Sequence, residues 1–186
     1  MNASTPARRL RPGAALGALL TAAATVLAAP GTAHAGRITY YSPYFEIRNT
    51  ATGKCLEVAD WRTDGGAPIR QWTCTGGANQ RWKGSNTGFL VNLNSGLCLD
   101  IPGASTAWGV QPIQWTCTLY TPPQNQSWQT PGVNRPSPNT VPNILGPVLD
   151  VYGYDPSDGA PVVTWGANGG ANQIWIGLNP RVDLPY

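Results

Sequence analysis

The tetrapeptide Asn125-Gln126-Ser127-Trp128 decides the fold, because the chain contains three closely related versions of it. The other two are Asn79-Gln80-Arg81-Trp82 and Asn172-Gln173-Ile174-Trp175, and successive tryptophans lie 46 and 47 residues apart. A fixed period of this length indicates a repeat architecture, in which each unit buries its apolar face against its neighbours. We therefore interpret the chain as three copies of one unit.

Each copy carries further matched residues upstream of its tetrapeptide. A leucine–acid–aliphatic triplet follows a glycine by three residues, and a tryptophan comes 15 residues after the acid. The acids are Glu57, Asp100 and Asp150, and the tryptophans are Trp72, Trp115 and Trp165. The middle copy has three extra residues, around Pro122-Pro123, between this tryptophan and the asparagine.

The β-rich runs within each unit are short. In the first copy they lie at 44–48, 55–58 and 69–73, and Gly, Asn and Pro interrupt them. No segment shows the 3.6-residue period of an amphipathic helix. Three units are too few for a β-propeller, which has at least four blades. We predict an all-β domain in which three pseudo-symmetric repeats close one core.

We predict a single domain over 44–180, between an N-terminal extension at 36–43 and a C-terminal tail at 181–186. Its repeats span about 44–85, 86–131 and 132–180. The proline-rich segment 130–147 could instead be a linker between two domains. We favour a loop that enters the third copy, because a fragment of two copies could not close its core.

The N-terminal segment has the features of a secretory leader. Three arginines precede an uncharged run at 14–29, and Ala33-His34-Ala35 has a small-x-small cleavage pattern. The run is shorter than the roughly 20 residues that a membrane-spanning helix needs. We predict a signal peptide over 1–35 and a secreted mature protein.

The charge balance of the mature chain excludes several classes of function. Without the leader, nine basic residues face nine acidic ones, and no histidine remains. A near-neutral surface argues against nucleic acid and against an anionic membrane as partners. The lack of histidine removes Ser-His-Asp and Cys-His catalysis and every histidine-dependent metal site. We expect no cofactor and no enzymatic activity.

The four cysteines allow three disulfide pairings. Nineteen residues separate Cys55 from Cys74 and Cys98 from Cys117, and the equivalent positions in the third copy hold no cysteine. Loss of both partners together indicates that they work as pairs, so we predict the disulfides Cys55–Cys74 and Cys98–Cys117. A zinc site of four thiolates is the alternative, but such sites usually show closely spaced C-x2-C pairs.

The triplets, the segment Gln114-Trp115-Thr116-Cys117 and the recurring Gln-x-Trp (QxW) motifs together resemble the ricin B-type lectin family, which includes the family 13 carbohydrate-binding modules. The likeness extends over all three copies, roughly from Tyr44 to Gly177. It implies a β-trefoil whose QxW tryptophans form the core. Those tryptophans are Trp82, Trp128 and Trp175.

The resemblance also implies up to three shallow sugar pockets, each built from an acid, an aromatic wall, an asparagine and the QxW glutamine. A carboxylate accepts charge-assisted hydrogen bonds from hydroxyls, an amide both donates and accepts, and an indole face covers an apolar C–H patch. The third copy supplies Asp150, Trp165, Asn172 and Gln173. The second supplies Asp100, Trp115, Asn125 and Gln126, and the first supplies Glu57, Trp72, Asn79 and Gln80.

We expect the third pocket to bind best and the first to bind worst. The second has a complete set, with Ile113 beside it, but its insertion could displace Asn125. In the first, glutamate replaces aspartate, and Arg70 stands where the third copy has Val163. Glu57 and Arg70 could pair and close that pocket. Three further aromatic residues lie on loops that could cover the pockets: Trp61, Trp108 and Tyr154.

Three alternatives stay open at this point. The acids and amides could serve only as scaffold, and the wall tryptophans could belong to the core. The domain could bind a protein through its loops, as an inhibitor or a partner of a secreted enzyme, with degenerate sugar pockets. A small glycoside hydrolase needs two carboxylates about 5–9.5 Å apart, whereas these acids belong to separate copies. We favour a secreted carbohydrate-binding module without catalysis.

Overall fold

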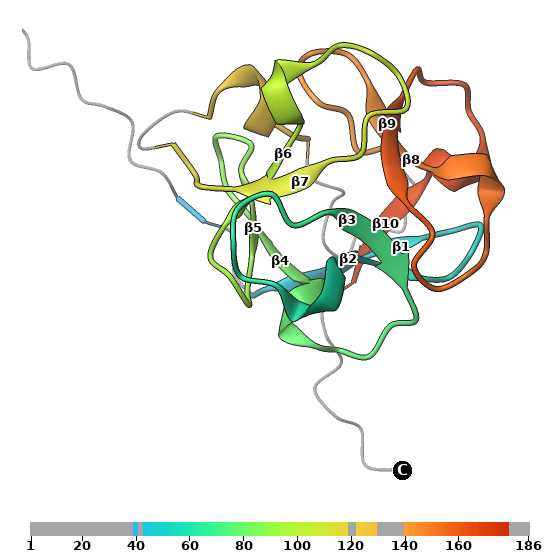
Figure 1. Ribbon diagram of the computed structural model, residues 1–186, viewed down its shortest axis with the longest axis horizontal. Coiled ribbons are helices and arrows are strands. Elements are labelled where there is room, and N and C mark those ends of the chain that lie inside the picture. Colours follow the sequence, from blue (N-terminus) through green and yellow to red (C-terminus); the bar gives the residue numbers. More distant parts are fainter. Residues whose placement is uncertain (1–38, 41–42, 119–121, 130–139, 179–186) are drawn as a thin grey trace, which may run out of the picture. The chain divides into compact units, whose positions relative to one another are not determined.

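The computed structural model describes residues 39–40, 43–118, 122–129 and 140–178. The predicted signal peptide, most of the N-terminal extension, the C-terminal tail and the first part of the proline-rich segment (130–139) lie outside the described residues. The described part consists of short strands joined by loops and single 3-10 turns, with no α-helix (Figure 1). No helix in this part is long and apolar enough to cross a membrane.

The strands fall into the three predicted copies, and their ends differ from the predicted runs by about one residue. They are β1 (Phe45–Asn49), β2 (Cys55–Val58), β3 (Ile69–Trp72), β4 (Arg81–Gly84), β5 (Leu90–Asn92), β6 (Cys98–Asp100), β7 (Ile113–Trp115), β8 (Val148–Val151), β9 (Val162–Trp165) and β10 (Trp175–Leu178). The 3-10 turns are η1 (Ala59–Trp61), η2 (Ala78–Gln80), η3 (Pro102–Ala104), η4 (Gln124–Gln126), η5 (Tyr152–Tyr154) and η6 (Ala171–Gln173).

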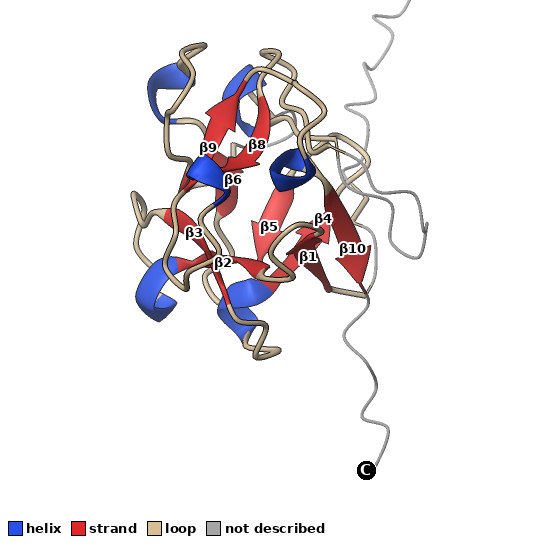
Figure 2. Cartoon of the chain, turned by 90° about the vertical axis from the view of Figure 1, so that its right-hand side faces the viewer, coloured by secondary structure: helices blue, strands red, loops and turns tan. Residues whose placement is uncertain are grey.

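The sheet closes by pairing the first strand with the last. Strands β3-β2-β1-β4-β5-β6-β7 follow one another in a single sheet, and β10 pairs antiparallel with β1. Strands β8 and β9 form a separate hairpin, which a bridge between Arg70 and Pro161 joins to β3. Figure 2 shows the strands around a common centre, with the 3-10 turns at the periphery. The predicted all-β trefoil is therefore confirmed.

Three hairpins, β2–β3, β6–β7 and β8–β9, have the same register. In each, the wall tryptophan pairs with the first residue of the preceding strand: Cys55 with Trp72, Cys98 with Trp115 and Val148 with Trp165. The acid pairs with the residue two places before the tryptophan: Arg70, Ile113 or Val163. Since successive side chains of a strand alternate between faces, acid and tryptophan lie on the same face of each hairpin.

The QxW tryptophans are buried in one apolar core, as the resemblance implies. Trp82, Trp128 and Trp175 belong to the same cluster of buried residues, together with Leu56, Leu99 and Leu149. Each indole Nε1 donates to the backbone carbonyl of the leucine of its own copy, at 3.0, 3.0 and 3.1 Å. A buried indole N–H needs an acceptor, so this bond fixes the orientation of each ring. Val141 also lies in this core, which places the end of the proline-rich segment inside the domain.

Each copy is joined to the preceding one around the ring by the residue just before its wall tryptophan. The backbones of Gln71, Gln114 and Thr164 each donate to, and accept from, a loop of a neighbouring copy, with distances of 2.7–3.0 Å. In each loop, the residue whose backbone N–H donates to the clasp residue is a glycine nine residues after the acid of that copy: Gly66, Gly109 or Gly159. These glycines have φ of +88°, +78° and +87°, a region that side chains with a Cβ rarely adopt. We call these three two-way contacts the clasp ring.

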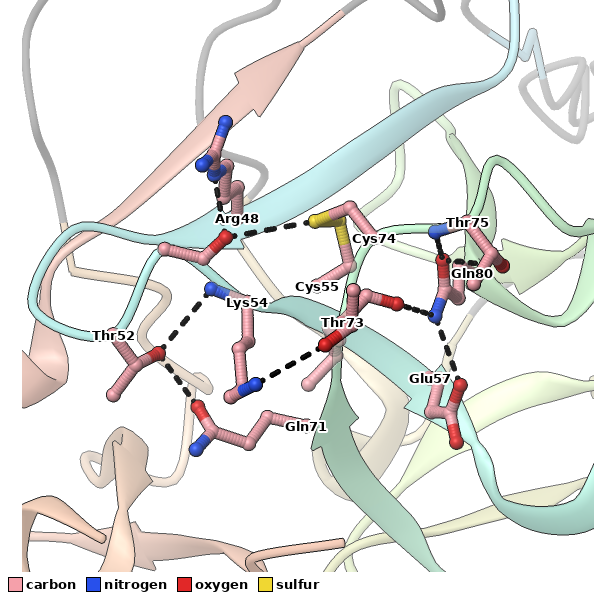
Figure 3. The surroundings of a disulfide bond; sticks show 12 residues. Arg48, Thr52, Lys54, Cys55, Glu57, Gln71, Thr73, Cys74, Thr75 and Gln80 are labelled. Atoms are coloured by element: carbon pink, nitrogen blue, oxygen red, sulfur yellow. Dashed lines mark hydrogen bonds between the residues drawn. A yellow bond between two sulfur atoms is a disulfide. The ribbon is translucent and has the colours of Figure 1, made fainter. Parts of the chain in front are cut away.

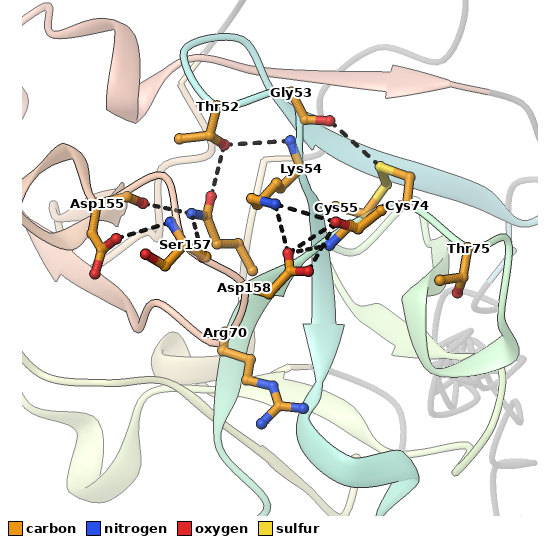
Figure 4. A network of polar contacts seen from close by, with 12 residues as sticks. Thr52, Gly53, Lys54, Cys55, Arg70, Cys74, Thr75, Asp155, Ser157 and Asp158 are labelled. Carbon is orange, nitrogen blue, oxygen red and sulfur yellow. Dashed lines mark hydrogen bonds and ion pairs between the residues drawn. A yellow bond between two sulfur atoms is a disulfide. The ribbon is translucent and has the colours of Figure 1, made fainter.

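Side chains strengthen the clasp ring. Gln71 Nε2 donates to the carbonyls of Asp155 and Ser157, while its Oε1 accepts from Thr52 (Figures 3 and 4). Gln114 repeats this pattern with the carbonyls of Arg62 and Asp64 and with Ser95. Thr164 donates only to carbonyls of the middle copy. Figure 4 also shows Asp158 beside Lys54, with which it forms an ion pair of 2.6 Å where the third copy meets the first. Asp158 also accepts a hydrogen bond from Thr73 N.

The disulfides are Cys55–Cys74 and Cys98–Cys117, the pairs that the repeat spacing predicts. Figure 3 shows the first of them beside Lys54 and Thr73, where it ties the start of β2 to the loop after β3. All four sulfurs are bonded, so no thiolate remains for the four-cysteine zinc site. In the loop-entropy description, closing a loop of this length stabilises the fold by about 3 kcal/mol.

The third copy should accept the same bridge. Val148 pairs with Trp165 as Cys55 pairs with Trp72, and Ala167 follows Trp165 by two residues, as Cys74 follows Trp72. We expect the double variant Val148→Cys/Ala167→Cys to form a third disulfide and to raise the free energy of unfolding by about 2–3 kcal/mol. Thiol titration and denaturant unfolding, with and without reductant, measure both effects. Persistence of two free thiols in the folded, oxidised variant would contradict the equivalence of the hairpins.

Candidate functional site

The carboxylate of Asp150 lies in a cradle of two amides from η6. Asn172 Nδ2 donates to Oδ1 at 2.9 Å, and Gln173 Nε2 donates to Oδ2 at 2.9 Å. The same amides are anchored to backbone carbonyls, Asn172 to Val151 and Gln173 to Gly166. All three side chains are nearly buried. The end of β8 is thereby tied to the QxW turn, and the carboxylate is held in one orientation.

The other two copies repeat this cradle. In the second, Asn125 Nδ2 donates to both oxygens of Asp100 at 3.0 Å, and Gln126 Nε2 donates to Oδ2 at 2.7 Å. In the first, Asn79 and Gln80 both donate to Oε2 of Glu57, at 3.2 and 2.9 Å (Figure 3 shows the bond from Gln80). The structure therefore brings together the predicted acid, asparagine and glutamine in every copy.

Electrostatics separates the first cradle from the other two. Burial raises the pKa of Asp100 and of Asp150, and the hydrogen bonds from the QxW glutamine and the asparagine offset only part of this effect. Glu57 instead forms an ion pair of 2.9 Å with Arg70 Nε, and Arg70 Nη2 also contacts Asp60 at 3.0 Å. The arginine thus neutralises the acid of the first copy, as the sequence suggests.

The wall tryptophans lie at the surface, so the alternative that places them in the core is wrong. Trp115 is 50% exposed, and Trp72 and Trp165 are partly exposed. The guanidinium of Arg70 stacks on the Trp72 ring, 4.5 Å from its centre, and occupies the face that a ligand would use. The rings of Trp115 and Trp165 carry no such cation among the described residues.

The asparagines of the first and third copies each hold an unpaired acceptor. Asn79 Oδ1 and Asn172 Oδ1 are buried and have no hydrogen-bond partner, because each Nδ2 makes the contacts to the acid and the backbone. Both oxygens lie close to a glycine of the QxW turn, Gly77 or Gly170. An unsatisfied buried acceptor costs free energy, so each of these two oxygens is a locally unfavourable feature of its cradle.

Two aromatic side chains lie beside these acceptors. Trp61 packs on Gly77 in the first copy, and the hydroxyl of Tyr154 lies against Gly170 in the third. Both residues have left-handed backbone, with φ of +55° and +57°, which costs a bulky residue about 1–2 kcal/mol. The middle copy has Ala104 at this position, also with positive φ. The predicted covering role therefore fits Trp61 and Tyr154, which share one offset from the acid.

Trp108 covers the site of a different copy from its own. A Cβ on Gly166 would lie 2.5 Å from the Trp108 ring, and the centres of the Trp108 and Trp165 rings are 5.6 Å apart. The ring of Tyr152 lies on the third copy's own loop, 6.3 Å from Trp165. Beside these rings is a cavity of about 330 Å³, with both copies in its walls. It is lined by Gly109, Gln111, Tyr152, Pro161, Val163 and Trp165.

The three extra residues of the middle copy alter the backbone around Asn125. In the other copies, the carbonyl of the QxW asparagine accepts a hydrogen bond from a buried asparagine of the following copy, Asn92 or Asn49. In the middle copy that carbonyl accepts from Ile101 N instead, and Asn143 Nδ2 is left without a partner. Asn125 still reaches Asp100, so the insertion shifts the cradle without breaking it.

Sequence analysis missed two sets of residues at these sites. The clasp residues Gln71, Gln114 and Thr164 directly precede the wall tryptophans in the sequence. The glycine nine residues after each acid was the sequence feature that could have revealed these contacts between copies. Tyr152 shares the cavity wall with Trp165, but no other copy has an aromatic residue at that position to mark it.

Comparison with known proteins agrees with this geometry. The sequence model of the ricin-type β-trefoil lectin domain matches residues 43–175. The chain belongs to this family. As a member of the ricin-type lectin family it also resembles solved structures over about three quarters of its length.

Among these structures is the designed threefold-symmetric protein ThreeFoil, with 31% identity and a TM-score of 0.68; the match covers 74% of this chain and 99% of ThreeFoil. An exo-β-1,3-galactanase from Clostridium thermocellum shows 28% identity and a TM-score of 0.67, over 75% of this chain and 31% of the enzyme. The C-terminal half of an earthworm R-type lectin, solved in complex with GalNAc, shows 22% identity and a TM-score of 0.60. This match covers 73% of this chain and 98% of the lectin half. This chain therefore spans about a third of the galactanase.

Proposed function

We propose that this ricin-type lectin domain is a secreted carbohydrate-binding module that holds neutral sugars in the third and second pockets, without catalysis. The observation that carries the proposal is the third copy's cradle. A buried carboxylate held by two amides lies on the same hairpin face as a partly exposed tryptophan, beside an open cavity. The two disulfides fit an oxidising compartment.

The cradle suits a sugar because it offers polar and apolar contacts together. The amides occupy only part of the lone pairs of Asp150, which leaves acceptor capacity for hydroxyl groups. Trp165 and Tyr152 supply flat apolar faces for the C–H side of a pyranose. Because the acids of separate copies are each held by amides, we assign them binding and not acid–base chemistry.

The ligand class is narrowed by chemistry and by one relative. Apart from Asp150 in the third cradle, no charged side chain lines the cavity beside it, which favours a neutral sugar. The galactanase with 28% identity carries a matching segment within a longer enzyme, so β-1,3-galactan is the first polysaccharide to test. A single shallow pocket of this kind binds weakly, with a dissociation constant on the order of 1 mM. Two pockets on one rigid body would gain avidity on a polymer.

The first test is binding of residues 36–186 to a broad glycan array and to insoluble polysaccharides that include β-1,3-galactan. We expect binding that the double variant Asp100→Ala/Asp150→Ala abolishes, because both carboxylate acceptors are lost. Asp64→Ala is the matched control, since Asp64 is exposed and pairs only with Arg62 in the described structure. Equal binding by wild type and a folded double variant would refute the pockets, and protein pull-down would then test the loop-mediated alternative.

Affinity should fall on acidification at a higher pH than for an ordinary aspartate. Ligand hydroxyls need ionised acceptors, and burial raises the pKa of Asp100 and Asp150, so they gain protons above the usual value of about 3.9. Their contribution to folding stability has the opposite sign: the folded state binds protons first, so this contribution increases as pH falls. Titration calorimetry between pH 7 and 4, with thermal unfolding in the same buffers, separates the two effects. A flat affinity over this range would contradict a direct role for the carboxylates.

The first pocket should be repairable. The variant Glu57→Asp/Arg70→Val gives the first copy the residues of the third and frees the face of Trp72 from the arginine. We expect the number of sugars bound per chain to rise by one, measured by titration calorimetry with a ligand from the array. Arg62→Val is the control, because it removes an exposed arginine whose only ion pair, within the described residues, is with Asp64. An unchanged number of sites in the folded variant would show that Arg70 is not what closes the pocket.

A further inference from the structure

The wall of each pocket lies at a seam between two copies, and the three seams differ. Each wall tryptophan packs near the clasp glycine of the neighbouring loop: Trp72 near Gly159, Trp115 near Gly65 and Gly66, and Trp165 near Gly109. The residue just before the clasp glycine therefore always stands next to a wall. It is Asp158 at the first wall, Gly65 at the second and Trp108 at the third.

Only the seam between the middle and third copies is aromatic on both sides. At the first wall, Asp158 is bound to Lys54 and Thr73, and Arg70 covers the tryptophan. At the second wall, Gly65 offers no side chain. At the third, Trp108 lies 5.6 Å from Trp165 on one side of the seam, and Tyr152 lies 6.3 Å from it.

The position of Tyr152 is equally particular to this seam. It is the second residue after the acid, where the first copy has Ala59 and the second has Pro102. Tyr152 is 54% exposed and Trp108 is 63% exposed, so both rings can meet a ligand. Two exposed rings flanking a wall tryptophan form an aromatic surface longer than one sugar pocket needs.

The cavity at this seam continues from the third copy into the middle one. Val163, Trp165 and Tyr152 belong to the third copy, whereas Gly109 and Gln111 come from the middle copy's loop. Gln111 Nε2 donates to the carbonyl of Ile69 at 2.9 Å, which fixes the amide at the cavity wall. The backbone of this loop is held by the clasp, since Gly109 N donates to Thr164 O at 2.7 Å. The extension is therefore part of the rigid frame.

We propose that this seam is a second sugar subsite, and that the third pocket recognises an internal stretch of a neutral polysaccharide chain and not a single terminal sugar. One unit is held at the Asp150 cradle, and the next lies across the seam on Trp108 and beside Gln111. The lining carries no charge, and the aromatic faces match the C–H faces of successive pyranose rings. This inference rests on the function proposed above, because the first unit is bound by the same cradle.

The experiment compares chain-length series. Wild type, Trp108→Ala and Tyr40→Ala are titrated with β-1,3-galacto-oligosaccharides and xylo-oligosaccharides of one to four units. Tyr40→Ala is the matched control, since Tyr40 is an exposed aromatic residue (41%) that belongs to none of the three cradles. We expect wild-type affinity to rise about tenfold from one unit to two or more in the series that binds, and Trp108→Ala to lose that rise while binding the single sugar as wild type does. Trp108→Phe should retain part of the rise.

Each other result overturns the inference in a recognisable way. Equal affinity of wild type for one and several units would show that there is no second subsite, while the proposed function stands. An equal loss by Trp108→Ala for the monosaccharide and the chain would mean that Trp108 only supports Trp165. A dimer in sedimentation analysis that Trp108→Ala abolishes would assign the aromatic surface to a second copy of the chain. Absence of any sugar binding by wild type would refute the proposed function itself.

Discussion

The structure depends on the clasp ring. Gln71, Gln114 and Thr164 each exchange two backbone hydrogen bonds with the loop of a neighbouring copy, and their side chains reach the carbonyls of the same loop. A single hairpin could not be stable, because its apolar face would remain in water and its outer strand edge unpaired. When three hairpins form a ring, each covers the apolar face of its neighbours and pairs with the strand edge of the next. The QxW tryptophans then fill the centre that the ring encloses, and their Nε1 atoms tie the core to the hairpins.

The same ring determines where ligands can bind. The wall tryptophan follows the clasp residue directly, so its backbone is fixed from both sides, by its own hairpin and by the neighbouring loop. The acid lies on the same hairpin face, and the QxW turn delivers two amides to it. The repeat thus brings an acid, two amides and a tryptophan together in every copy without any element devoted to this purpose alone. Pre-organisation limits the entropy lost when a ligand is bound.

The sequence was sufficient for the fold, the disulfides and the contents of each cradle, because all of these repeat with constant spacing. The pairing of Arg70 with Glu57 was also visible in the sequence, from the place of Arg70 in the repeat and its charge, and the structure shows that ion pair. It could not place Trp108, whose offset from the acid matches no aromatic in the other copies. That side chain acts across a seam, on the copy after its own, and contacts between copies follow from how the ring closes. The unpaired Oδ1 atoms of Asn79 and Asn172 were hidden for a similar reason, since hydrogen-bond satisfaction depends on atomic positions.

The departures from threefold symmetry are concentrated on the surface of the ring and not in its centre. All three QxW tryptophans are buried and bonded to a leucine carbonyl, whereas the three residues before the clasp glycines are an acid, a glycine and an aromatic. The reason is energetic. A core position is packed by neighbours from every copy, so a substitution there costs several kcal/mol of folding stability. A residue beside a wall tryptophan contacts neighbours at one seam only, so its substitution costs less. Each seam is therefore free to acquire its own chemistry. In this chain the seam at the first wall holds an ion pair, and the seam at the second wall has a glycine with no side chain. The seam at the third wall has an aromatic surface beside an intact carboxylate cradle.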